Sequence, residues 1–382
     1  VRLKSNQEQA VEEARQELIH LTSNAATRLS AWRALTADAV ARKQHPAAEE
    51  WGQKLKEQPG VVFADHLLDL EACQETDRSA ATLKQVESLA RSNAGTAAEM
   101  IAWMNRHDLA TEAIAWSREL NPTVADTQPV PMAVSESFSC RRDWAGLRDF
   151  VAGKNWGNLD SLRLAVASHA ARRLNNSAAP SMESQAMWRS ALKSAQVQSD
   201  QLAVVARLSE GWGYRDQAEE AWWAIANGDD NPKAALNALQ QLYKEKRDTY
   251  GLLRVAKRAH ELNPDDLIAA NNSASLALLV KNDAMAHRVA EKLYLEHPRN
   301  AAFAVTYAFA LHTEGKTGEG LKIMGKLRAD QLRVPAVAAY YVVMLVENGE
   351  VERARQFLNA AKKARLLPEE ERLLVSATKR LI

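Results

Sequence analysis

A small or apolar residue recurs every 34 residues through the second half of this chain. The slot is filled by Ala218, Leu252, Ala286, Gly320 and Ala354. Thirty-four residues is the length of a helix-turn-helix repeat, and one such pair of helices cannot bury its apolar face alone. The spacing therefore predicts a stacked solenoid of helix pairs.

Two further series share this spacing. Glycines stand five positions before the slot at Gly213, Gly315 and Gly349, and Pro264 lies 34 residues before Pro298. Gly and Pro interrupt regular helices, so these residues predict turns within and between the pairs.

The composition agrees with an all-α fold. The 382 residues are 46% hydrophobic and 25% charged, enough for a core shared along an array. The 15 Gly and 11 Pro fall mainly between helical stretches. A net charge of +1 gives no electrostatic reason to expect nucleic acid as a partner.

The cysteines and the hydropathy pattern bear on three classes of protein: disulfide-rich, metal-binding and membrane-inserted. Cys73 and Cys140 have no His or Cys at ligand spacing, so we predict neither a disulfide nor a metal site. The longest apolar run, 337–346, is about half of the roughly 20 residues that span a bilayer, which predicts a buried helix and no membrane insertion within the chain. The amino terminus lacks a signal-peptide pattern, but the chain does not begin with Met, so a removed anchor stays open. The compartment is not specified.

Turn residues divide the chain into about ten helix pairs between two terminal helices. Three prolines, Pro122, Pro129 and Pro131, predict a hinge at 121–131. We expect a leading helix in 1–28, degenerate pairs in 29–198, more regular pairs in 199–366 and a carboxy-terminal capping helix in 367–382. Whether 123–198 continues one superhelix or bends it stays open.

Three segments carry a family pattern. They are the run Ala31-Trp32-Arg33-Ala34-Leu35 followed by Ala48 and Leu55, the run 105–122, and the run 349–361. In these segments the chain resembles the tetratricopeptide repeat family, with several Gly and Tyr positions of the motif replaced. The resemblance implies a right-handed α-α superhelix of antiparallel helix pairs that binds a protein or peptide partner on its concave face.

That face is formed in the family by the first helix of each pair. The repeat register places eight side chains there: Arg207, Asn237, Gln241, Lys244, Asn271, Ser275, Phe309 and His312. Asn and cationic side chains suit the backbone of an extended peptide or an acidic group. The alternative is an ordinary polar inner face.

Farther along, the inner positions Ala336, Ala339, Val343 and Val346 are apolar. We expect the helix at 368–381 to bury them, and a groove for an amphipathic partner helix is the alternative. The acidic run 369–371 suits the positive end of that helix dipole.

Other motifs favour structural roles. The stretch 310–317 matches a phosphate-binding loop except that Ala310 replaces its first Gly, and it follows a helical rather than a strand pattern. Most of the ten Trp residues lie in amphipathic patterns typical of packing, with Trp103 the best candidate for the inner face. No catalytic motif stands out, and we predict no cofactor.

The sequence therefore predicts a noncatalytic protein-interaction scaffold. One alternative is a regulatory or substrate-recognition region of a larger enzyme or membrane-anchored assembly, and a lower-ranked one is a small-ligand or nucleotide binder. Partner identity and oligomeric state are not specified.

Overall fold

The computed structural model describes residues 3, 5, 7–175, 179–195, 198–281 and 283–380. All regular secondary structure in these ranges is helical. The chain divides into two compact units, Val1–Ser194 and Ala195–Ile382. This division lies four residues before the boundary predicted at 198.

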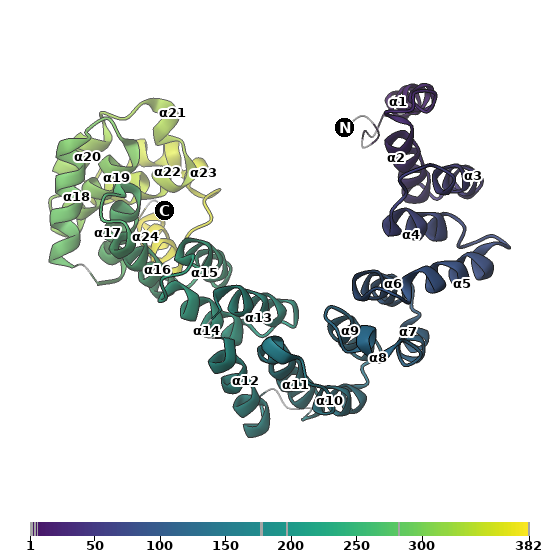
Figure 1. The fold of residues 1–382 in the computed structure, drawn as a ribbon. Helices are drawn as coiled ribbons and strands as arrows, with labels where there is room; N and C mark the ends of the chain where they lie inside the picture. The colour runs from purple at the N-terminus through teal and green to yellow at the C-terminus, as the bar shows by residue number, and fades with distance from the viewer. Residues whose placement is uncertain are drawn as a thin grey trace. The chain divides into compact units, whose positions relative to one another are not determined.

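In the described residues of the first unit, α1 precedes five helix pairs, and two short helices interrupt the array (Figure 1). The helices are α1 (Glu8–Leu21), α2 (Arg28–Ala41), α3 (His45–Lys56), α4 (Phe63–Ala72), α5 (Ser79–Ala90), α6 (Ala94–Arg106), α7 (Ala110–Ser117), α8 (Pro122–Ala125), α9 (Val130–Cys140), α10 (Trp144–Ala152), the 3-10 turn η2 (Gly157–Leu159), α11 (Asp160–Leu174) and α12 (Met182–Ala195). The segment predicted as a hinge, 121–131, contains α8, which packs against α6 and α9. Its role as a hinge stays a prediction.

In the second unit, the residues that the structure describes form five pairs followed by a terminal helix. The helices are α13 (Ser199–Gly211), α14 (Arg215–Ala226), α15 (Pro232–Lys246), α16 (Thr249–Leu262), α17 (Leu267–Lys281), α18 (Ala284–Glu296), α19 (Ala301–Thr313), α20 (Thr317–Met324), the short α21 (Ala329–Leu332), α22 (Pro335–Glu347), α23 (Val351–Ala361) and α24 (Pro368–Lys379).

The 34-residue spacing has a backbone cause in the turns inside the pairs. Gly213, Arg247, Gly315 and Gly349 all adopt a left-handed conformation, with φ between +53° and +79°. The next residue in each turn donates its N–H to the carbonyl five residues earlier, at 2.8 to 2.9 Å. A left-handed residue with this bond is the Schellman motif, which ends a helix. The described residues form an all-α array of helix pairs.

The small-residue slot lies where helices approach closely. A Cβ added to Gly320 of α20 would stand 2.6 Å from the carbonyl oxygen of Ala308 in α19 and 2.5 Å from Met344 of α22. Both distances are shorter than a van der Waals contact, so only glycine fits without a shift. In the next repeat, Ala354 in this slot is fully buried.

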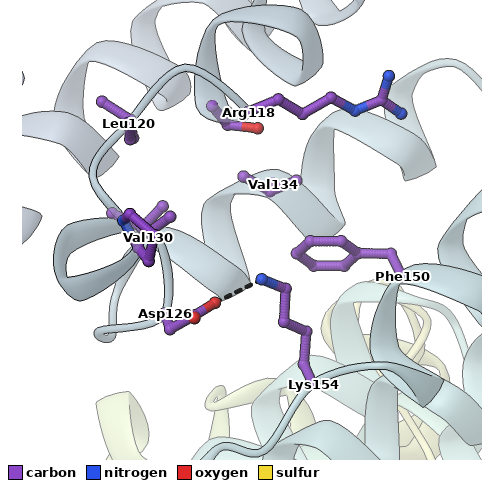
Figure 2. Close-up of a pocket in the computed structure, with 10 residues that line it drawn as sticks. Arg118, Leu120, Asp126, Val130, Val134, Phe150 and Lys154 are labelled. Atoms are coloured by element: carbon purple, nitrogen blue, oxygen red, sulfur yellow. Dashed lines mark hydrogen bonds and ion pairs between the residues drawn. The ribbon is translucent and has the colours of Figure 1, made fainter.

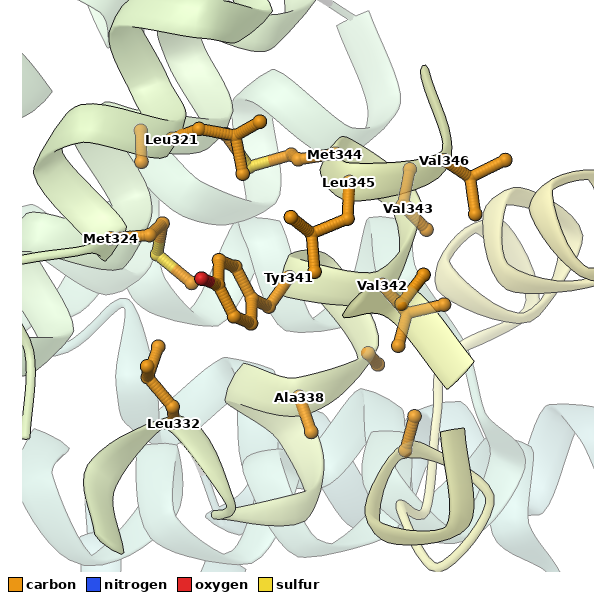
Figure 3. Packing of buried hydrophobic residues seen from close by; sticks show 14 of the residues in the cluster. Leu321, Met324, Leu332, Ala338, Tyr341, Val342, Val343, Met344, Leu345 and Val346 are labelled. Atoms are coloured by element: carbon orange, nitrogen blue, oxygen red, sulfur yellow. The ribbon is translucent and has the colours of Figure 1, made fainter. Parts of the chain in front are cut away.

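A large apolar cluster of the second unit surrounds α22 (Figure 3). Tyr341 and Met344 point toward Met324 and Leu321 of α20, while Val342 and Val346 point the other way. Helix α22 is therefore apolar on more than one face, because it packs against α20, α23 and α24.

Ion pairs with buried carboxylates join helices in the first unit. Asp38 of α2 is bound by Arg15 of α1 at 2.5 Å, and Asp65 of α4 by Arg33 of α2 at 2.6 Å. Asp69 of α4 is completely buried and pairs with Arg78 at 3.0 Å. Burial alone would raise the pKa of Asp65, but hydrogen bonds from Arg33 and from the Val62 amide outweigh it and lower the pKa.

Candidate functional site

The first half of the predicted inner surface is open. We call Arg207 of α13 with Asn237, Gln241 and Lys244 of α15 the polar row, and all four residues are exposed. Gln241 donates to Glu245 at 2.9 Å. Among the described residues, the side chains of Arg207 and Lys244 have no hydrogen-bond or ion-pair partner. The polar row therefore offers two unneutralised cations to a ligand.

The second half of the predicted surface is covered. Asn271 of α17 is only 6% exposed and Phe309 of α19 only 3%, while Ser275 and His312 are half-buried. The Phe309 ring meets the Tyr340 ring edge-on, with 4.8 Å between centroids. In the free chain Asn271 and Phe309 are therefore not open to a ligand, and their assignment to partner binding stays a prediction. The repeat register gives the direction of a side chain but not what another segment places over it.

His312 is held as a structural group in this half. Its Nδ1 lies 3.0 Å from the Thr317 hydroxyl, at the start of α20. Burial lowers the pKa of His312, and the Glu347 carboxylate offsets this only in part. At neutral pH the imidazole is therefore uncharged and does not extend the positive charge of the polar row.

The covering element is α24, which packs against α22 and also against α17 (Figure 1). Each of the three glutamates in its first turn reaches a different partner. Glu371 accepts from Arg247 Nη2 at 2.5 Å, Glu370 accepts from the Tyr340 hydroxyl at 2.6 Å, and Glu369 accepts from the Thr249 hydroxyl. The helix is thereby fixed to the α15–α16 turn at one side and to α22 at the other.

Apolar contacts continue along α24. Leu374 and Ala377 are buried in the cluster around α22, and Leu373 packs against both this cluster and the one that contains Phe309. Beyond its last turn, Arg380 pairs with Glu347 of α22 at 2.5 Å. We call the surface under α24, formed by Arg247, Thr249, Phe309, Tyr340 and Val343, the helix groove.

The expected burial of the four apolar inner positions is largely confirmed. Ala339, Val343 and Val346 are 3%, 7% and 6% exposed, whereas Ala336 is exposed at the start of α22. Val343 and Val346 belong to the same cluster as Leu374 and Ala377 of α24. The start of α22, at Ala336, is thus not covered by the terminal helix.

The partners of the acidic residues in α24 were not predicted from the sequence. A helix dipole explains an acidic first turn, so the run 369–371 needed no other partner. The available signal was Arg247, which occupies the left-handed turn position that is Gly213, Gly315 and Gly349 in other repeats. A non-glycine residue at positive φ is strained, which makes its side chain a candidate for a specific role.

Two other sequence candidates have structural places. Trp103 is 3% exposed and its indole N–H donates to Glu71 at 2.9 Å, so the expectation that it faces the inner surface is wrong. Gly315 and Lys316 of the nucleotide-like motif lie in the turn between α19 and α20, where Lys316 pairs with Glu314 at 2.9 Å.

A hollow in the first unit, about 300 Å³ in volume, lies among α7, α8, α9 and α10 (Figure 2). Leu120, Val130, Val134 and Phe150 form its apolar lining. Lys154 is bonded to Asp126 and lies over the Phe150 ring, 5.7 Å from its centroid. The lysine is thereby neutralised, whereas the exposed Arg118, which also lines the hollow, has no ion-pair partner among the described residues.

Within the described ranges, no group of three His, Cys, Asp or Glu side chains could hold one metal ion. None of the helices formed by these residues has the length and apolar character needed to cross a bilayer.

No protein-family model matches the chain, and no curated protein matches it. Solved structures that resemble it include three complexes or domains. They are the Cut9–Hcn1 hetero-tetramer of the APC/C (13% identity, 94% of this chain and 80% of that chain, TM-score 0.28), the yeast Tom70 (11%, 97% and 92%, 0.31) and the P58(IPK) TPR domain (12%, 92% and 98%, 0.24). Because these TM-scores are below 0.5, the functional proposals rest on this chain's own contacts.

Proposed function

We propose that this chain is a noncatalytic protein-interaction scaffold that binds a peptide segment of a partner on the inner face of its second unit. The observation that carries the proposal is the polar row, where Arg207 and Lys244 stand exposed and unpaired among the described residues. Two exposed cations without an ion-pair partner contribute little to the stability of the free chain, whereas an anionic ligand could pair with them.

The chemistry of the polar row favours an acidic, extended segment. A carboxylate can accept hydrogen bonds from Arg207 or Lys244, and the exposed Asn237 amide can both donate to and accept from a peptide backbone. Contacts of this kind are partly solvated, so the affinity should fall as salt screens them.

The test compares the full chain with its Arg207→Ala/Lys244→Ala variant on an array of short peptides that differ in net charge. We expect the unmodified chain to prefer acidic peptides and the variant to bind them about tenfold more weakly, since each exposed pair contributes up to about 1 kcal/mol. A matched control is Lys292→Ala/Arg328→Ala, because these cations of the same unit are 73% and 71% exposed. Equal binding of acidic peptides by the unmodified chain and the polar-row variant would overturn the assignment.

A further inference from the structure

The helix groove already holds an amphipathic helix. Helix α24 follows α23 after only six residues, 362–367, yet it reaches back to the turn between α15 and α16. Its contacts have two chemical parts, an acidic first turn on Arg247, Thr249 and Tyr340, and an apolar stripe on α22. These contacts show which kind of helix binds in the groove, namely one with an acidic first turn followed by an apolar stripe.

The fit of α24 is incomplete. A hollow of about 410 Å³ remains beside it, lined by Leu366, Leu374 and Val375 on one side and by Ala361 at the end of α23. Val375 is 46% exposed although it borders this hollow. Apolar surface left in water forgoes about 25 cal/mol per Å², so a helix with bulkier residues there would bind better.

The rim of the hollow is basic. Lys362 and Arg365 line it together with Arg247, and both are exposed without a side-chain partner among the described residues. Helix α24 neutralises only Arg247, through Glu371. That ion pair is itself open to solvent, with side chains 43% and 55% exposed, so it holds the helix weakly.

We propose that the helix groove is the binding site for an acidic amphipathic helix of a partner protein, and that α24 occupies this site in the free chain as a resident competitor. The partner helix carries acidic residues in its first turn, as α24 does at 369–371, followed by an apolar residue bulkier than Val375 at the position that borders the hollow. This inference rests on the proposed protein-binding role but uses a different part of the inner face from the polar row.

A second copy of this chain fits the groove less well. Its α24 would bring the same Val375, and would leave the same hollow and the same basic rim. The unfilled volume and the unneutralised Lys362 and Arg365 both favour a helix of different sequence.

The test measures binding of fluorescent peptides to the full chain. One peptide has the sequence of residues 366–380, a second carries Val375→Phe, and a third replaces its three first-turn glutamates by Gln. The receiving chains are the unmodified protein and the variant Glu371→Arg, which repels Arg247 and loosens its own α24 while leaving the groove intact. Glu352→Arg is the matched control, because Glu352 lies on α23 and is 87% exposed.

We expect the first peptide to bind Glu371→Arg about three to ten times more tightly than the unmodified or control chain, because its competitor is weakened. The Val375→Phe peptide should bind more tightly still, and the Gln peptide more weakly. Saturating peptide should also speed hydrogen exchange in α24 while the rest of the second unit stays protected.

The double variant Arg247→Glu/Glu371→Arg restores an ion pair of reversed sign, and it should protect α24 again and bind the acidic peptide poorly. This result separates loss of docking from loss of folding. Equal peptide affinity for the unmodified chain and Glu371→Arg would overturn the proposal, as would a dimer of Glu371→Arg that exchanges α24 between copies. Failure here leaves the acidic-peptide result of the polar row standing, and Arg207→Ala/Lys244→Ala should still bind the α24 peptide.

Discussion

The two units stack similar helix pairs with different side-chain chemistry. In the first unit, buried carboxylates at Asp38, Asp65 and Asp69 are bound by arginines from other helices or turns. In the second unit, the cluster around α22 is apolar, and α24 adds its polar contacts mainly at the rim. Buried ion pairs demand specific geometry, whereas apolar surfaces accept several partners of suitable shape.

This difference suggests that the two units have different roles. Removing one partner of an ion pair between repeats costs the protein much stability, so these ion pairs specify how the helix pairs of the first unit stack. An apolar inner face under a helix with exposed ion pairs can exchange that helix for another. Four experiments test whether the two units differ in this way.

The largest effect is expected from Asp69→Ala. Asp69 is fully buried and pairs with Arg78 at 3.0 Å and Lys56 at 3.4 Å, so its removal takes this carboxylate from Lys56 and leaves Arg78 with Glu49 at 3.0 Å. The free energy of unfolding of the first unit should fall by about 3 to 5 kcal/mol. Hydrogen exchange during urea unfolding resolves the two units. A loss no larger than that of the exposed control Glu352→Ala would contradict the role assigned to the ion pairs.

Acid should weaken the first unit through His169. Burial lowers the pKa of His169 to about 3, and Arg173 and Arg172 add to the effect. The unfolded chain binds a proton near pH 6.5 but the folded chain does not, so stability is present above pH 6.5 and is lost as the pH falls toward 3. Between pH 6 and pH 4 this amounts to about 2 to 3 kcal/mol. His169→Gln should have a correspondingly flatter pH dependence, and an identical slope would contradict the assignment.

Gly320→Ala should destabilise the second unit by about 1 to 3 kcal/mol, because the new methyl group meets the Ala308 carbonyl at 2.6 Å. Gly318→Ala on the same helix is the matched control, since its Cβ would meet only Asn348 Oδ1 at 3.6 Å. The control should be neutral or slightly stabilising. Thermal unfolding of both variants measures the difference, and equal midpoints would show that the small-residue slot is not sterically required.

The smallest effect is expected from Tyr340→Phe, which removes the hydroxyl that donates to Glu370. Glu370 keeps the Leu367 amide at 2.8 Å, so the loss should be about 1 kcal/mol. Burial and the Glu370 carboxylate raise the pKa of Tyr340 well above 10. Stability from this group is therefore full below pH 10 and falls as the pH rises further. Urea unfolding at pH 9 and pH 11 should show a steeper loss for the unmodified chain than for the variant.

Local features of the fold were predictable from the sequence. The 34-residue series locates the turns because a left-handed residue at Gly213, Gly315 or Gly349 ends a helix through bonds within six residues. The small residues Ala354 and Gly320 likewise indicate where a helix lies very close to the other helix of its pair and to the neighbouring pair. Exposure of the polar row follows from the same register, as Arg207 and Lys244 show.

The covered half of the inner face was decided only by tertiary structure. Nothing near Phe309 or Asn271 in the sequence indicates that α24 folds back to the turn at Arg247, more than 100 residues earlier. The same holds for Asp69, whose acidic side chain would be placed at the surface of an isolated amphipathic helix but is buried because Arg78 and Lys56 surround it. Helix periods and turns arise from neighbours in the chain, so the sequence by itself determined the repeating pairs. Burial of a charge or occupation of a groove depends on distant segments, and these only the folded chain brings together.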